Sequence, residues 1–96
     1  MSAYAILDVD IQDPDKYQIY MKGVQQLISD VGGRYLTRGG EHKVYEGEWQ
    51  PSRLVIVEFP SMEAIETFYD SPEYQELKSI RQTCSSTNLV SVAGLD

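Results

Sequence analysis

The sequence predicts one α+β domain in which strands and helices follow the order β-α-β-β-α-β. Three observations support this fold class: residues 4–11 and 53–59 are rich in β-branched and aromatic residues, two apolar stripes with helical spacing follow capping signals, and paired glycines bracket an alternating run at 34–38. This order is typical of a four-stranded antiparallel sheet with two helices on one face. The 96 residues suit a single domain spanning 1–96.

The first strand and the first helix are predicted from composition and from a helix start signal. Residues 4–11 are apolar on both faces, as expected of a central strand. Asp13-Pro14-Asp15 then supplies an N-cap, a proline at the first helical position and an acid in the first turn. The helix ends at Gly32 or Gly33. Its apolar stripe consists of Tyr17, Tyr20, Met21, Val24, Leu27, Ile28 and Val31.

The second strand, 34–38, carries two arginines. In an extended run, Arg34, Leu36 and Arg38 point to one face, and Tyr35 and Thr37 point to the other. That face therefore carries cations that need a carboxylate, water or a bound anion as a partner.

Paired glycines follow the second strand. Gly39-Gly40 predicts a bulge or a tight bend, after which residues 42–45 continue the strand. Residues 46–52 contain turn residues without periodicity and connect this strand to residues 53–59, the third strand. The two strands form a hairpin with a long tip.

A second helical region begins after Ser61, which follows the strand-ending Pro60. Ser71-Pro72-Glu73 repeats the cap, proline and acid pattern, so the helical region is broken and restarts there. Residues 86–94 form the last strand. The apolar stripes are Ile65, Phe68 and Tyr69 before the break, and Tyr74, Leu77 and Ile80 after it.

The face of the sheet opposite the helices is predicted to be buried as well. Residues 4–11 and 54–59 are apolar on both faces instead of alternating cleanly. A second copy of the chain would cover this face, and a chain this short gains stability from a partner subunit. We therefore expect a homodimer.

Composition excludes several classes of function. The net charge of −7 disfavours nucleic-acid binding, and no apolar run approaches the roughly 18 residues that span a bilayer. Cys84 is the only cysteine, so no internal disulfide or thiolate metal cage forms, and residues 1–4 lack the features of a secretory signal. His42 is the only histidine, and no metal-ligand spacing joins it to Asp8, Asp10 or Glu58. We expect a cytoplasmic protein without metal or cofactor.

The residues that carry a family resemblance extend over nearly the whole chain. They are Asp13-Pro14, Gly32-Gly33-Arg34-Tyr35-Leu36, Arg38-Gly39-Gly40, Glu46-Gly47 with Trp49, Pro51 and Arg53, Glu58-Phe59-Pro60-Ser61, Tyr69 with Ser71-Pro72-Glu73-Tyr74, and Arg81. On these motifs the sequence resembles the family catalogued as domain of unknown function 1330, in the dimeric α+β barrel superfamily. The departures are Thr37, where an aliphatic residue is common, and Phe68, where tryptophan is common.

The resemblance implies a ferredoxin-like subunit that pairs into a dimeric α+β barrel. It also implies a cleft between each sheet and its helices or its partner. It implies no established reaction, because the superfamily includes cofactor-free monooxygenases, isomerases, haem enzymes and proteins without known activity.

Arg38 is the first candidate for ligand binding. Gly39-Gly40 leave space beside it, and a guanidinium binds carboxylate or phosphate in a forked geometry. The alternative is that Arg38 or Arg34 pairs with Glu58 across the hairpin, and the register decides between them. Glu58 is the only acid in a strongly apolar strand, so burial would raise its pKa and suit it to general-base catalysis, unless it forms a structural ion pair.

Aromatic residues supply the other candidates. Tyr69 and Tyr74 flank the Ser71-Pro72 break and either present hydroxyls to the cleft or pack in the core. Trp49, in the hairpin tip, either contacts the partner subunit or covers the cleft. His42 follows a Gly-Gly-Glu bend near an exposed edge, which does not favour a catalytic role.

Three functions follow from these residues. The leading one is a homodimer that binds a small polar or anionic metabolite. The second is a cofactor-free enzyme resembling the superfamily's monooxygenases or isomerases, with Glu58 or Tyr69 transferring a proton. The third is a structural or regulatory dimer without a ligand. The ligand-binding candidates are Arg34, Arg38, Trp49, Glu58, Tyr69 and Tyr74.

Overall fold

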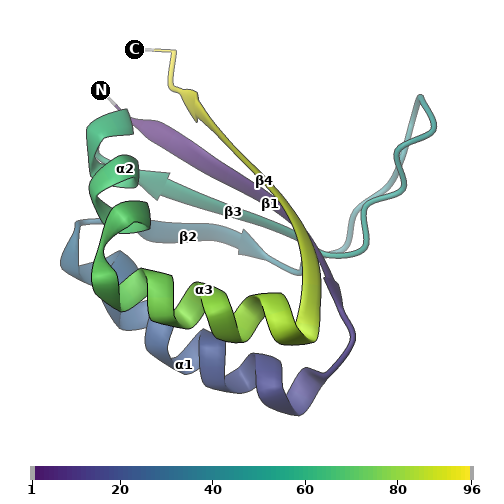
Figure 1. The fold of residues 1–96 in the computed structure, drawn as a ribbon. Coiled ribbons are helices and arrows are strands. Elements are labelled where there is room, and N and C mark those ends of the chain that lie inside the picture. The colour runs from purple at the N-terminus through teal and green to yellow at the C-terminus, as the bar shows by residue number, and fades with distance from the viewer. Residues whose placement is uncertain (1, 96) are drawn as a thin grey trace.

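The protein is one antiparallel sheet covered on one side by helices (Figure 1). The computed structural model describes residues 2–95. Its elements are β1 (Ala3–Ile11), α1 (Pro14–Asp30), β2 (Arg34–Arg38), β3 (Leu54–Phe59), α2 (Met62–Asp70), α3 (Pro72–Cys84) and β4 (Ser85–Ala93). The four strands are ordered β2-β3-β1-β4, and every neighbouring pair is antiparallel. The predicted α+β fold class is confirmed, with the second helical region formed by two consecutive helices.

Each helix begins at the cap that the sequence predicts. Asp13, Ser61 and Ser71 each accept a hydrogen bond from the backbone N–H three residues later, at 3.0–3.2 Å. Ser71 also ends α2, with extended backbone angles that redirect the chain before α3. After α1, Gly32 has a φ of 81°, which favours glycine and allows the sharp turn into β2. Within residues 2–95, no helix is both long and apolar enough to cross a membrane.

The two faces of the sheet differ in burial. The inner face lies under the helices and carries the buried residues Ala3, Ala5, Leu7, Val9, Val55, Val57 and Phe59. The outer face carries the half-buried or exposed residues Tyr4, Ile6, Leu54, Ile56, Val90 and Val92. Side chains alternate between the two faces along each strand, which places this second apolar layer opposite the helices.

A bulge in β2 changes the face on which Arg38 lies. The register pairs Arg34 with Glu58, Tyr35 with Val57, Thr37 with Ile56 and Arg38 with Val55. Leu36 is therefore an extra residue in β2. Because Val55 faces the helices, Arg38 lies on the inner side beside Tyr35, and its guanidinium carbon is 4.6 Å from the centroid of the Tyr35 ring. The prediction that Arg34 and Arg38 share a face is wrong, because strict alternation does not survive a bulge.

Residues 39–53 form a long arm between β2 and β3, which extends beyond the sheet in Figure 1. The predicted continuation of the strand through 42–45 is wrong, since these residues have no regular structure. The arm is held at its base: Gly39 N–H donates to the Leu54 carbonyl at 2.8 Å, and a His42 ring nitrogen lies 3.0 Å from the Pro51 carbonyl oxygen. These local hydrogen bonds therefore take the place of the strand pairing expected for residues 42–45.

Candidate functional site

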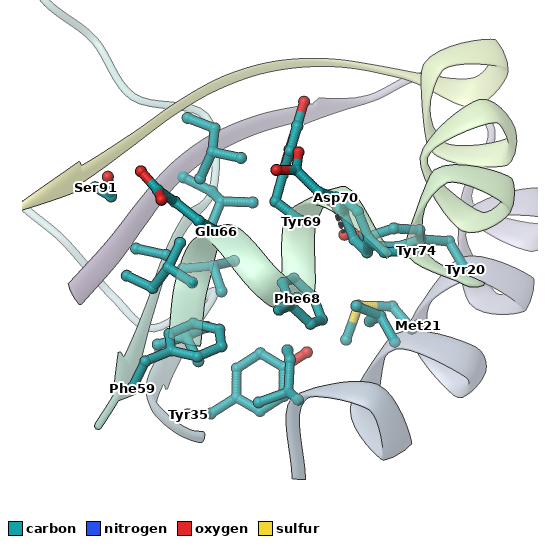
Figure 2. Close-up of a pocket in the computed structure, with 18 of the residues that line it drawn as sticks. Tyr20, Met21, Tyr35, Phe59, Glu66, Phe68, Tyr69, Asp70, Tyr74 and Ser91 are labelled. Carbon is teal, nitrogen blue, oxygen red and sulfur yellow. Dashed lines mark hydrogen bonds between the residues drawn. The ribbon is translucent and has the colours of Figure 1, made fainter. Parts of the chain in front are cut away.

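A cavity of about 580 Å³ lies between the inner face of the sheet and the helices (Figure 2). The cavity lies near Ser71, where the chain changes direction between α2 and α3. The helix α2 contacts β1, β3 and β4, whereas α3 packs along α1. Most of its lining is apolar and aromatic. The lining includes Ala5, Leu7, Met21, Val24, Ile28, Val55, Val57, Phe59, Ile65, Phe68 and Leu89.

Five tyrosines also line the cavity, and they come from four different elements. They are Tyr17, Tyr20, Tyr35, Tyr69 and Tyr74. The hydroxyls of Tyr20 and Tyr74 are hydrogen-bonded at 3.1 Å, a contact that joins α1 to α3. Burial raises the pKa of Tyr17, Tyr20 and Tyr35, so these phenols stay protonated at neutral pH and act as hydrogen-bond partners instead of charges.

Two carboxylates lie along the α2 side of the cavity. Glu66 and Asp70 are four residues apart in α2, on one side of the helix, and Ser91 of β4 completes this polar part of the lining. Figure 2 shows these three residues at the cavity, with Phe68 pointing into the layer between α2 and the sheet. The chemical arrangement is an apolar chamber with neutral phenols inside and acids at one border.

Glu58 lies on the outer face and pairs with Arg34. The Nε of Arg34 donates to Oε1 of Glu58 at 2.7 Å. This hydrogen bond is the main cause that holds the pKa of Glu58 below its usual range. Of the two predicted partners, Arg34 forms the ion pair and Arg38 does not, as the register requires. The structural ion pair is thus the alternative that forms for Glu58, and because the pair stabilises the charged carboxylate, burial does not raise the Glu58 pKa.

The space beside Gly39 is occupied by a second arginine. A Cβ at Gly39 would lie 2.8 Å from Nη1 of Arg53, so glycine is needed here both for this approach and for its φ of 74°. Arg38 lies at the edge of the inner face over Tyr35, and it is not among the cavity-lining residues. The paired glycines therefore make room for Arg53, where a space beside Arg38 was expected.

Trp49 fixes the arm to the outer side of β1. Its indole N–H donates to Oδ2 of Asp8 at 2.9 Å, and the Ser52 backbone N–H donates to Oδ1 at 2.9 Å. The Trp49 hydrogen bond is the main cause that lowers the pKa of Asp8. Trp49 does not line the cavity and remains largely exposed. Its exposed ring suits the predicted partner contact better than the predicted cover over the cleft.

Acid should release Trp49 from Asp8. A native pKa below the ordinary value of about 3.9 means that the contact is complete above that pH and is lost as pH falls through the lowered value. Trp49 is the only tryptophan, so its fluorescence reports this contact directly. We expect constant emission from pH 7 to about pH 4 and a red shift below it.

The Asp8→Ala variant should show the acid-type emission already at neutral pH. Asp10→Ala is the matched control, because Asp10 is on the same strand and accepts no bond from the arm. An Asp8→Ala spectrum identical to that of the wild type would contradict the contact.

The structure thus distributes the predicted site residues over four places. Tyr69 and Tyr74 line the cavity, Arg34 and Glu58 pair on the outer face, and Trp49 lies in the arm, while Arg38 borders the inner face. The sequence did not predict that Tyr17, Tyr20, Tyr35, Glu66 and Asp70 line a cavity. Among residues 2–95, no group of three or more His, Cys, Asp or Glu side chains is placed to hold a metal ion.

Solved structures of low sequence identity share the fold. A protein of unknown function from Rhodopseudomonas palustris has a TM-score of 0.79 at 19% identity, covering 99% of this chain and 83% of its own. A dimeric ferredoxin-like protein of unknown function from Jannaschia sp. CCS1 has a TM-score of 0.72 at 11% identity, covering 98% and 100%. SnoaB, a cofactor-independent oxygenase from Streptomyces nogalater, has a TM-score of 0.70 at 8% identity, covering 99% and 94%. The fold is therefore ferredoxin-like.

Sequence comparison places the chain in a family. A search among curated proteins found no match. One family, described as Domain of unknown function (DUF1330), matches residues 2–95, which is nearly the whole chain. This match agrees with the motifs at the helix caps, the paired glycines and the hairpin, and the chain therefore belongs to the DUF1330 family.

Proposed function

We propose that this protein is a cytoplasmic homodimer that binds a small, largely apolar molecule with a polar or anionic group in the cavity between its helices and its sheet. The cavity itself carries this proposal. Its volume of about 580 Å³ is within the usual range for small-molecule sites, and its lining combines apolar walls with several tyrosine side chains. A purely structural dimer would be expected to fill this space with side chains, because protein interiors are close-packed.

The lining refines the class of ligand. Five phenols and a mostly aliphatic surround favour an aromatic or alicyclic molecule over a fully polar metabolite. Since the buried phenols stay neutral, they would donate or accept single hydrogen bonds and orient the ligand. Of the predicted ligand contacts, Tyr69 and Tyr74 retain this role in the proposal.

A variant that fills the cavity should abolish binding. Leu89 is a half-buried residue of the lining, and Leu89→Trp would occupy much of the space. Using benzamide as the probe and NMR shift titration as the measurement, we expect the Kd to rise at least about tenfold. Ile19→Trp is the matched control: it adds a similar bulk to an exposed position of α1 and should leave the Kd unchanged.

Two outcomes would contradict the proposal. One is that benzamide and related small aromatic compounds produce no shifts in the wild type at millimolar concentration. The other is that shifts occur equally in the Leu89→Trp variant, which would place binding elsewhere on the molecule.

A second candidate is an enzyme that acts on the bound molecule without a cofactor. The observation that favours it is that two carboxylates, Glu66 and Asp70, border the same cavity as the neutral phenols, so a base and proton donors would face one ligand. Tyr69 remains a candidate proton donor, whereas Glu58 is separated from the cavity by the sheet. The fold is shared with the cofactor-independent oxygenase SnoaB, and this likeness concerns the fold alone.

The homodimer in this proposal forms through the outer face of the sheet. The apolar residues Ile6, Leu54, Ile56, Val90 and Val92 lie there side by side on three adjacent strands. Val90 is 58% exposed in the single chain, and contiguous exposed apolar surface of this kind marks interaction sites. Similar folds occur as dimers, including the Jannaschia protein.

A further inference from the structure

Three buried polar atoms on the helix side of the sheet have no hydrogen-bond partner within residues 2–95. They are Nε of Arg53, Nε of Arg81 and Oγ1 of Thr87. Buried polar groups are nearly always satisfied, because leaving one unpaired costs free energy. Three such atoms in one region therefore indicate a missing hydrogen-bonding partner.

The sheet register places two of these residues in one row, next to the cavity. The Val9 backbone N–H donates to the Arg53 carbonyl at 2.9 Å, and Val9 pairs with Thr87 on its other side. The preceding row of inner-face residues, which includes Leu7 and Leu89, lines the cavity. Rows on one face of a sheet are about 7 Å apart, so Arg53 and Thr87 lie one row beyond the cavity wall.

Arg81 reaches the same region from α3. It is only 5% exposed and lies two turns after Tyr74 on the same side of the helix. Its guanidinium carbon is 5.8 Å from the centroid of the Tyr20 ring, which lines the cavity. The positive charges of Arg53 and Arg81 both act on Tyr17, where they oppose the rise in pKa that burial causes. Tyr17 therefore lies in the field of both guanidiniums.

Neither arginine has a carboxylate partner among residues 2–95. The Arg34–Glu58 pair is the single ion pair found in the described part of the chain, and it lies on the outer face. The carboxylates that line the cavity, Glu66 and Asp70, belong to α2, whereas Arg53 and Arg81 lie outside the cavity lining and act on Tyr17, which is part of it. A buried guanidinium without a counter-charge is costly, so an anion from outside the chain would relieve it.

We propose that Arg53 and Arg81, with the hydroxyls of Tyr17 and Thr87, form an anion-binding subsite that takes the carboxylate or phosphate group of the ligand. This inference rests on the proposed function and adds the ligand's charge and orientation. The apolar body of the ligand fills the cavity, its anionic group lies toward Arg53 and Arg81, and its opposite end lies toward Glu66 and Asp70. Guanidinium groups suit this role because they bind both anions in a forked geometry.

The test compares benzoate, phenyl phosphate and the neutral benzamide by NMR shift titration. We expect the wild type to bind at least one of the two anions about tenfold or more tightly than benzamide. The anion with the lower Kd shows whether the subsite prefers a carboxylate or a phosphate group. Arg53→Met and Arg81→Met should each remove most of this preference while leaving the Kd for benzamide within about twofold. Lys22→Met is the matched control, because it removes one exposed positive charge of α1 and should keep the preference.

A stability measurement separates a binding role from a structural one. If the role of Arg81 is to bind an anion, its charge is buried and unpaired in the unliganded protein. Arg81→Met removes this charge, so the unliganded variant should melt at the same or a higher temperature than the unliganded wild type. If Arg81 were structural, the variant would melt at a lower temperature. Arg53 is half-buried, so Arg53→Met provides an independent variant if Arg81→Met does not fold.

The failures of the two proposals can be distinguished. Equal affinity of the wild type for benzoate, phenyl phosphate and benzamide would overturn the subsite and leave cavity binding intact. Absence of binding for all three would overturn the proposed function and the subsite with it. An anion preference that survives in both arginine variants would show that other groups bind the anion, which also overturns the assignment.

Discussion

Replacing Tyr74 by alanine should lower the free energy of unfolding by about 3–5 kcal/mol, the usual cost of removing a large buried aromatic side chain. Tyr74 is 1% exposed, and its ring lies 4.6 Å from that of Phe68 and 5.3 Å from that of Tyr69, measured between centroids. Its hydroxyl bonds to Tyr20 at 3.1 Å. One side chain thus joins α1, α2 and α3, so its loss affects the whole helical layer.

The existing cavity makes this site intolerant of truncation. Tyr74 lines a space of about 580 Å³, so the volume removed by the substitution joins an existing void, and no single neighbour can move in to fill it. A domain of this size has a stability of only about 5–15 kcal/mol, so the variant would be near or beyond the limit of folding. Urea denaturation at fixed protein concentration measures the difference.

Tyr74→Phe separates the hydroxyl from the ring. It keeps the aromatic packing and leaves the Tyr20 hydroxyl without its partner, so the expected loss is about 1 kcal/mol. If Tyr74→Ala and Tyr74→Phe had equal effects, the hydroxyl pair and not the aromatic packing would determine stability, and the account of the helical layer would be wrong.

The fold was predictable because its signals are local. The caps at Asp13, Ser61 and Ser71 lie within three residues of the N–H groups that they bind, and apolar stripes follow from helical geometry alone. The position of Arg38 was not predictable, because it depends on the bulge at Leu36, which exists only in the pairing of β2 with β3.

The candidate site was less predictable than the fold. Tyr69 and Tyr74 were found because the Ser71-Pro72 break is visible in the sequence. Tyr17 and Tyr20 were assigned to a helical stripe, and a stripe has the same spacing whether it borders a packed core or a cavity. Burial of the Nε atoms of Arg53 and Arg81 likewise results from elements distant in sequence, so residue type and spacing alone did not reveal it.

Introducing a charge at the centre of the outer face should convert the proposed dimer to a monomer. Ile56 is in the middle of β3 and pairs with Ile6 of β1, in the centre of the apolar surface proposed to meet a second copy. In a twofold interface each patch faces the same patch on the partner, so Ile56→Asp would bury two carboxylates close together. We expect the dimer dissociation constant to rise at least about a hundredfold, as for a truncated interface hot spot of about 3 kcal/mol.

Sedimentation velocity over a range of concentrations measures this effect, with Ile19→Asp as the control. Both variants replace isoleucine by aspartate, but Ile19 is a 57% exposed residue of α1. The helix α1 lies on the opposite side of the sheet from the outer face. Thermal stability should also become independent of protein concentration in Ile56→Asp, because folding is no longer coupled to association. If Ile19→Asp dissociated the dimer and Ile56→Asp did not, the interface would lie on the helices. The outer face would then need another partner.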